Sequence, residues 1–259
     1  MNLHEPVAAS PATAPTRRVR HELRRRQLSV VSTERLSPAM LRIVLGGEEL
    51  RGFTSLGADD HVKIFLPGED GAEAERRDYT PRHYDARRNE LTLDFAVHEA
   101  GPATAWALSA KVGDALTIGG PRGSLVIEES VRRFLLIGDE TALPAIGRRI
   151  EEAGPGVSIV SLVAVPEPAD KQNFETAADL HAHWVHRPLE RADDPEALLA
   201  ALRTIEIEPD CFVWIAAEAS VVRALRSVLL EERAHPKTWF KASGYWVRGK
   251  ADTTEKFED

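Results

Sequence analysis

The stretch RRDYTPRHY, residues 76–84, places an arginine, a tyrosine, a threonine and a second arginine close together in what otherwise has the pattern of a short β-strand. Two interpretations are open. The strand is either solvent-exposed and basic by chance, or its side chains hold a large, flat, anionic ligand. The segments on either side decide between them.

Residues 28–128 alternate between apolar and polar residues in short runs separated by Gly, Pro, Asp and Asn. In ELTLDFAVH, residues 90–98, Leu91, Leu93 and Phe95 fall on one face of a strand. About six such runs predict antiparallel strands. We expect them to close into a small barrel, because closure removes exposed strand edges.

A short helix is predicted to interrupt these strands at residues 101–114, GPATAWALSAKVGD. Gly101 suits its cap, Pro102 suits the first helical position, and Gly113 ends it. The first turn of a helix carries unpaired backbone amides, and Thr104 adds a hydroxyl there. This end of the helix is therefore expected to favour a phosphate group.

After residue 130 the pattern changes to alternating strands and helices. Apolar runs predict strands at residues 132–140, 157–165, 181–187 and 211–218. Helical spacing predicts helices at residues 141–154, 195–205 and 219–233. The second half is therefore predicted to be a doubly wound α/β domain with a parallel sheet.

The predicted fold is an antiparallel β-barrel of about six strands followed by this α/β domain. We place the boundary near residues 127–131. The predicted units are an unstructured tail, the barrel domain, the α/β domain and a polar tail, at residues 1–17, 18–129, 130–250 and 251–259.

Composition argues against several classes of protein. A net charge of −8 argues against a dedicated nucleic-acid binder, and the single cysteine, Cys211, excludes a disulfide or thiolate metal site. No apolar run reaches the roughly 20 residues of a membrane span, and no secretory signal core is present, so a cytoplasmic protein without membrane partners is expected. The basic run at residues 17–26 is interpreted as a solvated lead-in.

Six motifs share order and spacing with one known family. They are HVKIFLP, RDYTPR, LDFAVHEAGPATAWA, GDALTIGGPRGS, LLIGDETALPAI and GYWVRGK, and they cover nearly all of residues 18–250. On these motifs the chain resembles the siderophore-interacting protein family, flavin-dependent ferric-siderophore reductases of the ferredoxin-reductase group. The resemblance implies an FAD-binding barrel and an NAD(P)H-binding α/β domain.

For the stretch at residues 76–84, the resemblance implies that it binds FAD. Arg77 would reach the pyrophosphate, Tyr79 would lie along the isoalloxazine, and Thr80 would hydrogen-bond near N5. Since neighbours on a strand face opposite sides, Thr80 would act partly through its backbone amide. The other residues that the resemblance assigns to FAD are Asp94, Val97, His98, Gly101, Pro102, Ala103 and Thr104.

The resemblance places the nicotinamide nucleotide at GDETALPAI, which lacks the ordinary G-x-G-x-x-G fingerprint. The residues implied are Gly138, Asp139, Thr141, Ala142, Pro144 and Glu218. Thr141 is expected to begin the helix there. Trp246, with Tyr245, is expected to shield the other face of the flavin ring.

Two further positions bear on the nucleotide. Ala217 stands before Glu218, where the family usually has glycine, and this departure puts close approach of the nucleotide in doubt. Arg187 is a candidate for the adenosine phosphate of NADPH. His181 and His183 share a strand face that His186 does not, so no metal site is expected.

The implied reaction passes hydride from NAD(P)H to the flavin and single electrons to Fe(III) in a siderophore, which releases Fe(II). The flavin carries this chemistry, so no catalytic side chain is expected. Because siderophores are usually anionic, a local cationic cluster is needed. Its candidate residues are Lys63, Arg122, Arg82 and Arg248, with Lys250 after them.

The alternatives are a non-catalytic siderophore carrier, for which Ala217 is the best support, and a general or ferredoxin-fed flavin reductase. A monomer is expected.

Overall fold

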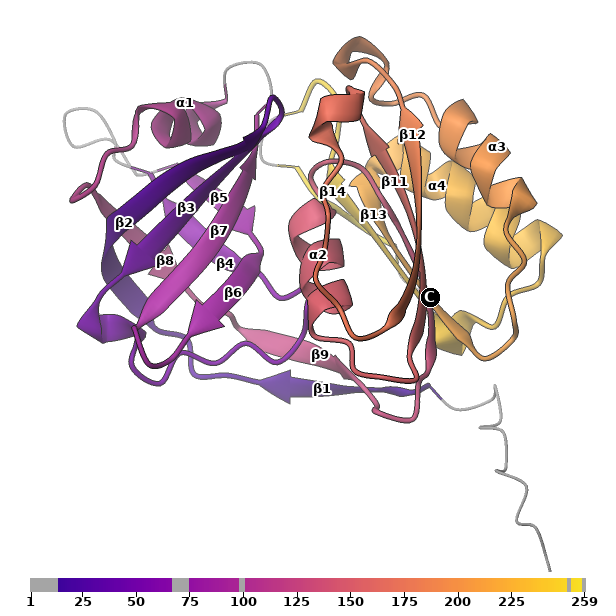
Figure 1. The fold of residues 1–259 in the computed structure, drawn as a ribbon, viewed down its shortest axis with the longest axis horizontal. Helices are drawn as coiled ribbons and strands as arrows, with labels where there is room; N and C mark the ends of the chain where they lie inside the picture. Colours follow the sequence, from indigo (N-terminus) through magenta and orange to yellow (C-terminus); the bar gives the residue numbers. More distant parts are fainter. Residues whose placement is uncertain (1–13, 67–74, 98–100, 251–252, 258–259) are drawn as a thin grey trace, which may run out of the picture.

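The computed structural model describes residues 14–66, 75–97, 101–250 and 253–257. Two lobes lie side by side, an antiparallel barrel-like sheet and a parallel sheet covered by helices (Figure 1). This arrangement confirms the predicted fold class.

The barrel lobe is a seven-stranded antiparallel sheet in the order β5-β4-β8-β2-β3-β7-β6. Its strands are β2 (Arg25–Ser37), β3 (Met40–Gly46), β4 (Val62–Phe65), β5 (Arg76–Tyr79), β6 (Pro81–Asp85), β7 (Glu90–Ala96) and β8 (Ala115–Gly119). Alternate residues of these strands fill the barrel, and Leu91, Leu93 and Phe95 on β7 are fully buried.

The stretch at residues 76–84 forms two strands, so its interpretation as a single strand was wrong. β5 pairs with β4 at one edge of the sheet, and β6 pairs with β7 at the other. Thr80 alone separates them. Pro81 lacks an amide hydrogen and restricts the residue before it, so the ladder breaks at this point. The chain itself therefore joins the two edges of the barrel at Thr80.

The predicted helix is present as α1 (Pro102–Ser109), with Gly101 as its cap and Pro102 in its first turn. It ends before the expected Gly113. Ala103 and Ala107 pack on the barrel core, and the ring of Trp106 lies 5.8 Å from that of Phe95.

The second lobe has five parallel strands in the order β12-β11-β10-β13-β14, with β15 antiparallel at the edge. Its strands are β10 (Arg133–Gly138), β11 (Ser158–Val165), β12 (Asp179–His186), β13 (Cys211–Glu218), β14 (Phe240–Trp246) and β15 (Glu255–Lys256). The helices are α2 (Leu143–Glu151), α3 (Glu196–Thr204) and α4 (Ala219–Ser227). Short helical turns span Glu48–Leu50, Pro168–Asp170, Leu189–Arg191, Val228–Glu232 and Lys237–Trp239.

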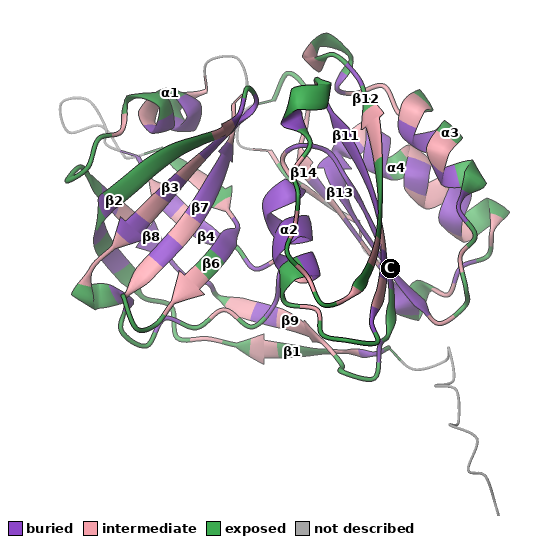
Figure 2. Cartoon of the chain, viewed as in Figure 1, coloured by how far each residue is buried: buried purple, intermediate pink, exposed green. Residues whose placement is uncertain are grey.

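Helices cover both faces of this sheet. α3 and α4 pack on one face, and α2 packs on the other, where it faces the barrel lobe (Figures 1 and 2). All of β13 is buried, as expected for a central strand. One expectation differs: α2 begins at Leu143 rather than Thr141. The helix predicted at residues 219–233 is present as α4, which continues directly into the helical turn Val228–Glu232.

The segments outside the predicted domains are partly structured. β1 (Thr16–Arg20) pairs antiparallel with β9 (Gly123–Ile127), so the basic run begins within a strand, and most of its side chains are exposed as expected. β15 pairs with β14, and Phe257 packs against the core, so the polar tail is not wholly loose. In the described part of the chain, no helix combines the length and apolar character needed to cross a bilayer.

Candidate active site

A cleft of about 1690 Å³ lies between the lobes. β4, β5 and α1 line it from the barrel lobe, and the start of α2 and β14 line it from the other lobe. The predicted site residues that line the cleft are Lys63, Arg77, Tyr79, Thr80, Asp94, Gly101, Ala103, Thr104, Arg122, Thr141, Pro144, Tyr245, Trp246, Arg248 and Lys250. Residues from both halves of the sequence therefore meet in one cavity.

The remaining predicted residues lie elsewhere. Val97 packs against the barrel core, and Pro102 is exposed. Buried positions behind the cleft wall are held by Gly138, Asp139, Ala142 and Glu218. His98 lies outside the described residues.

The barrel wall carries the residues of β5. The Arg77 guanidinium bonds to the Glu75 carboxylate at 2.9 Å, and the ring of Tyr79 lies 4.2 Å from that of Phe95. Burial raises the pKa of Tyr79, so its hydroxyl stays neutral. Thr80, at the turn between β5 and β6, is buried but still lines the cleft.

The start of α1 forms another part of this wall. Thr104 is buried in its first turn, which carries no acidic residue, and Gly101 and Ala103 line the cleft beside it. A helix N-terminus without a carboxylate favours an anion. With Arg77 in the same cavity, these donors fit a ligand that combines a pyrophosphate with a flat ring, as FAD does.

The C-terminal aromatic residue Tyr245 meets this wall from the opposite lobe. It hydrogen-bonds to Thr80 and packs edge-on against Trp214, with ring centroids 6.1 Å apart. Burial, reinforced by the nearby Asp59 carboxylate, raises the pKa of Tyr245.

Asp59 and Lys241 form an ion pair across the cleft that the sequence did not predict. Asp59 also accepts a hydrogen bond from the Trp214 indole at 3.0 Å. Burial alone would raise the pKa of Asp59, but Lys241 and the hydrogen bonds outweigh it and hold that pKa below its usual value. Asp59 lies in a loop and Lys241 in a strand without clear periodicity, so neither had a signal in the sequence.

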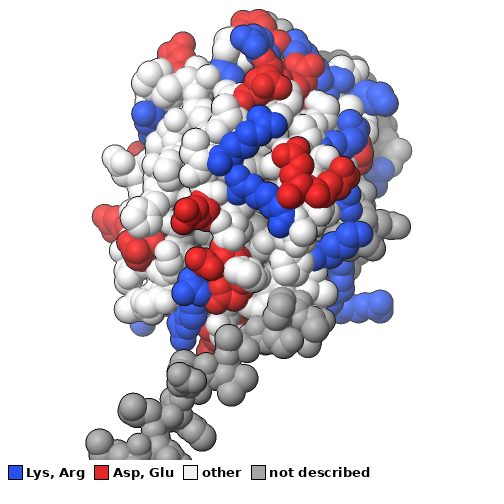
Figure 3. Space-filling model, turned by 90° about the vertical axis from the view of Figure 1, so that its right-hand side faces the viewer, with Lys and Arg blue, Asp and Glu red and all other residues white. Residues whose placement is uncertain are grey.

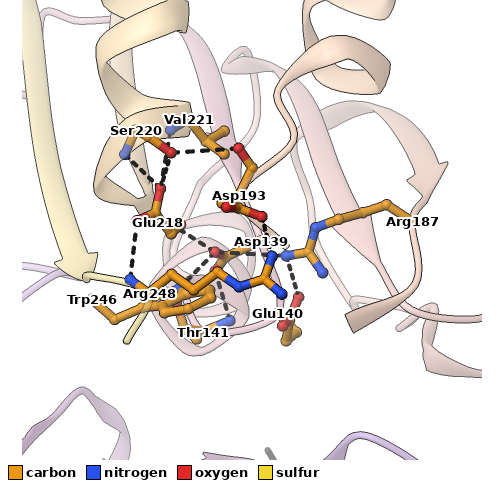
Figure 4. Close-up of polar contacts among 10 residues, drawn as sticks. All are labelled: Asp139, Glu140, Thr141, Arg187, Asp193, Glu218, Ser220, Val221, Trp246 and Arg248. Carbon is orange, nitrogen blue, oxygen red and sulfur yellow. Dashed lines mark hydrogen bonds and ion pairs between the residues drawn. The ribbon is translucent and has the colours of Figure 1, made fainter. Parts of the chain in front are cut away.

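Asp139 ties together the ends of β10, β13 and β14 (Figure 4). Its Oδ1 accepts hydrogen bonds from the Thr141 amide at 2.9 Å and hydroxyl at 2.5 Å. Its Oδ2 accepts from the Glu218 amide and the Trp246 indole, both at 3.0 Å. The adjacent ends of β10 and β13 form the switch point of the sheet, where doubly wound domains bind ligands.

Glu218 acts as the cap of α4. Its Oε2 accepts from the Ser220 and Val221 amides, at 2.5 and 3.3 Å. Its Oε1 accepts from the Arg248 amide at 3.2 Å, and the Arg248 guanidinium pairs with Asp193 (Figure 4). Asp139 and Glu218 lie behind the cleft wall, and their hydrogen bonds hold the strand ends that form this wall in place.

Arg187 is not placed to bind an adenosine phosphate, which corrects the expectation from sequence. Its side chain is 6% exposed and lies 3.0 Å from Glu140 and 3.8 Å from Asp139 (Figure 4). Burial and the Asp139 charge raise the pKa of Glu140 to about 7, although Arg187 opposes them. The pair is part of the interior.

Arg82 is likewise not part of a substrate patch. It is 5% exposed, and its guanidinium makes two hydrogen bonds to Glu151 on α2, at 2.7 and 2.5 Å. The sequence pattern placed Arg82 on a strand, but it did not indicate that α2 packs over this side chain.

The lysines and arginines that line the cleft come from both lobes: Arg18, Lys63, Arg77 and Arg122 from the barrel half, and Lys237, Lys241, Arg248 and Lys250 from the other half. Lys63 lies 2.8 Å from Asp78, and both side chains are partly exposed. Arg122 is exposed. Arg18 and His61 line the same cavity and were not predicted.

Ala217 and the histidines of β12 were also singled out in the sequence. The side chain of Ala217 is fully buried in the core beside Gly244 of β14 and does not line the cleft. His181 and His183 are exposed on β12. The described residues hold no cluster of three or more metal-ligating side chains.

An antiparallel barrel and a doubly wound lobe that share one cleft define the two-domain fold of the ferredoxin-reductase type. Family comparison narrows this class. Residues 131–249 match the model described as siderophore-interacting protein, and residues 29–76 and 69–125 match the siderophore-interacting FAD-binding domain. The chain belongs to the siderophore-interacting protein family.

Individual relatives agree with this assignment. An NADPH-dependent ferric-chelate reductase from Escherichia coli is 38% identical, over 88% of this chain and 95% of that protein. The ferric vibriobactin reductase ViuB of Vibrio cholerae is 29% identical, over 87% of this chain and 90% of that protein. A siderophore utilization protein from T. fusca superimposes with a TM-score of 0.84 and 33% identity, over 92% of this chain and 98% of that one.

Proposed function

We propose that the protein is a ferric-siderophore reductase that binds FAD in the barrel lobe and uses NADPH bound at the α/β lobe. One observation carries this proposal: β5, α1, the start of α2 and the cationic side chains all open into the same cleft. Donor, flavin and acceptor would then meet in one cavity. The family and the names of its reductase relatives support the assignment.

The flavin site would be built from β5 and α1. Arg77, Thr104 and the first amides of α1 bind the pyrophosphate, because guanidinium and amide donors match its oxygens. Tyr79 packs along the ring system, and Thr80 bonds to its polar edge. When bound, FAD would accept hydride from NADPH and pass single electrons to Fe(III).

The nucleotide would approach the start of α2. Thr141 and Pro144 line the cleft there, at the switch point of the parallel sheet. Asp139 and Glu218 hold this edge in shape from behind. Tyr245, which bonds to Thr80, covers the position where the nicotinamide would meet the flavin.

The ferric siderophore would bind at Lys63, Arg122 and Arg248, which face the cleft. With a net charge of −8, attraction of an anion has to be local. On the side of the molecule seen in Figure 3, acidic and basic side chains are interspersed and form no broad basic surface. The lysine and arginine side chains that line the cleft support it as the place where an anionic iron chelate would bind.

The structure removes the main support for the carrier alternative. A carrier was suggested by Ala217, whose side chain lies in the core and does not line the cleft. Against a ferredoxin-fed enzyme, the α/β lobe has the full strand order of a nucleotide-binding sheet and an ordered β10–α2 turn.

An anaerobic reaction cycle tests the proposal. FAD-loaded protein should lose its yellow colour with NADPH, regain it when a ferric siderophore is added, and release iron that a ferrous chelator traps. The iron-free siderophore is the control and should restore no colour. A carrier would bind the ferric siderophore while its flavin stays oxidised in NADPH. A general flavin reductase would reduce free flavin and gain nothing from the ferric siderophore.

A further inference from the structure

One face of α2 points at the barrel lobe. Along this face the helix runs from the part of the cleft where the nucleotide would bind to its contacts with the barrel. Pro144, Gly147, Arg148 and Glu151 lie at helical spacings of three, four and seven residues, so they share this face. Pro144 lines the cleft at the nucleotide end. Arg148, one turn further along, and Glu151 contact the barrel.

Arg148 holds the barrel at the turn after Thr80. Its side chain is 9% exposed, and Nη1 donates to the Pro81 carbonyl at 3.0 Å. The same guanidinium donates to the Ser55 hydroxyl at 2.8 Å and the Ser55 carbonyl at 2.9 Å. Nε donates to Glu152 at 2.7 Å. One buried side chain thus fixes two barrel segments to α2.

The next turn of α2 adds a second connection. The Glu151 carboxylate accepts hydrogen bonds from both terminal nitrogens of Arg82, and Arg82 Nε lies 3.7 Å from Asp94. Asp94 is bound in turn by Arg42, at 2.7 and 2.8 Å. A Cβ at Gly147 would lie 3.0 Å from Arg82 Nη2, so the glycine admits the guanidinium across the helix. Thr80 and Asp94 both line the cleft beside this network.

We propose that Arg148 is a positioning residue that holds the Thr80–Pro81 turn against α2. The helix that begins at the nucleotide end of the cleft thereby also fixes the part of the barrel that faces the flavin. This inference rests on the proposed function for its kinetic consequence only. A misplacement of about 1 Å in reacting groups can cost on the order of 100-fold in rate, which makes such a link matter.

The test compares Arg148→Met, which removes the hydrogen bonds, with Arg148→Lys, which restores a donor. Arg133→Met is the matched control, because Arg133 pairs with Asp210 on the surface, away from the cleft. In cofactor-free protein, hydrogen–deuterium exchange over residues 76–85 should quicken at least about tenfold in Arg148→Met and less in Arg148→Lys. The control should leave this segment unchanged.

With FAD bound, reduction by saturating NADPH should slow about 10- to 100-fold in Arg148→Met and less in Arg148→Lys. The NADPH concentration for half-maximal rate should change less than about threefold, since the nucleotide end of α2 is untouched. The visible spectrum of the bound flavin should shift, because Thr80 moves.

Exchange that quickens evenly over the whole chain, with spectrum and rate unchanged, would mean a purely structural role and overturn the inference. If wild-type flavin is not reduced by NADPH, the proposed function fails, but exchange in the cofactor-free protein still decides whether Arg148 holds the turn. If Arg148→Met does not fold, Arg148→Gln, which also removes the guanidinium bonds to Pro81 and Ser55, replaces it. Unchanged exchange over residues 76–85 in that variant would overturn the inference too.

Discussion

Two groups of cationic side chains lie near the boundary between the lobes, and they differ in what surrounds them. Arg77, Lys63 and Arg122 open into the cleft. Arg82, Arg148 and Arg187 are buried, against carboxylates or backbone carbonyls. The first group lines the cavity in which an anionic ligand would bind, whereas the second holds the protein together. Arginines occur in both groups, so the neighbouring elements and not the residue type decide which role an arginine has.

The largest effect should come from Arg187→Met. Above the Glu140 pKa, at about pH 8, this change leaves a buried carboxylate without its partner and should lower the free energy of unfolding by about 3–5 kcal/mol. Urea denaturation measures it. The preference for NADPH over NADH should stay as in the wild type. Intact stability with a lost NADPH preference would place Arg187 in the cofactor site instead.

Arg77→Ala should have the next largest effect, and on binding rather than stability. Loss of charge-assisted hydrogen bonds to the pyrophosphate should weaken FAD binding about 10- to 100-fold. The unfolding free energy of the cofactor-free protein should change by less than about 1 kcal/mol, because the Glu75 partner of Arg77 is exposed. Quenching of flavin fluorescence gives the affinity. If Arg77→Ala instead lowered the unfolding free energy and left FAD affinity unchanged, Arg77 would belong with the buried, structural arginines.

The fold and the cleft-facing group were largely predictable, because both depend on local patterns. Alternation with period two gave the strands around Leu91, and Gly101 with Pro102 gave the start of α1. The order of the motifs predicted that Arg77 and Thr104 line one cavity. Thr80 and Arg82 of the same stretch differ in role, since Thr80 lines the cleft and Arg82 bonds to Glu151.

The buried group was not predictable, because its partners are distant in sequence. Arg82 meets Glu151 from α2, and Arg187 meets Glu140 from the β10–α2 turn. Nothing in the residues around Arg82 or Arg187 indicates these contacts. β14 was also missed as a strand, since FKASGYW lacks a clear apolar pattern and is held in place by β13.

The pH dependence of stability gives a smaller test of the buried group. The folded protein holds the Glu140 proton up to about pH 7, above the ordinary value of 4.5. Its contribution to stability is therefore full below 4.5 and is lost as pH rises toward 7, with a slope of roughly 1 kcal/mol per pH unit. Glu140→Gln should remove this slope in urea titrations. An identical slope in the variant would show that another group titrates.

Lys63→Ala should have the smallest effect, confined to the iron substrate. Its exposed pair with Asp78 adds little stability, so unfolding should be unchanged within about 1 kcal/mol. The KM for an anionic ferric siderophore should rise about 3- to 10-fold, with FAD affinity unchanged, because the charge acts only on the outer ligand. Asp78→Asn should shift that KM in the opposite direction. Equal losses for a neutral iron chelate would argue against the charge.

Calorimetric titration of the cofactor-free protein with FAD tests the central claim most directly, that the cleft between the lobes holds the flavin through side chains left open to it. We predict a single FAD bound per chain, an affinity reduced in Arg77→Ala, and an affinity close to wild type in the surface control Arg133→Met. Absence of FAD binding to the wild type, or equal affinity in Arg77→Ala, would contradict the account.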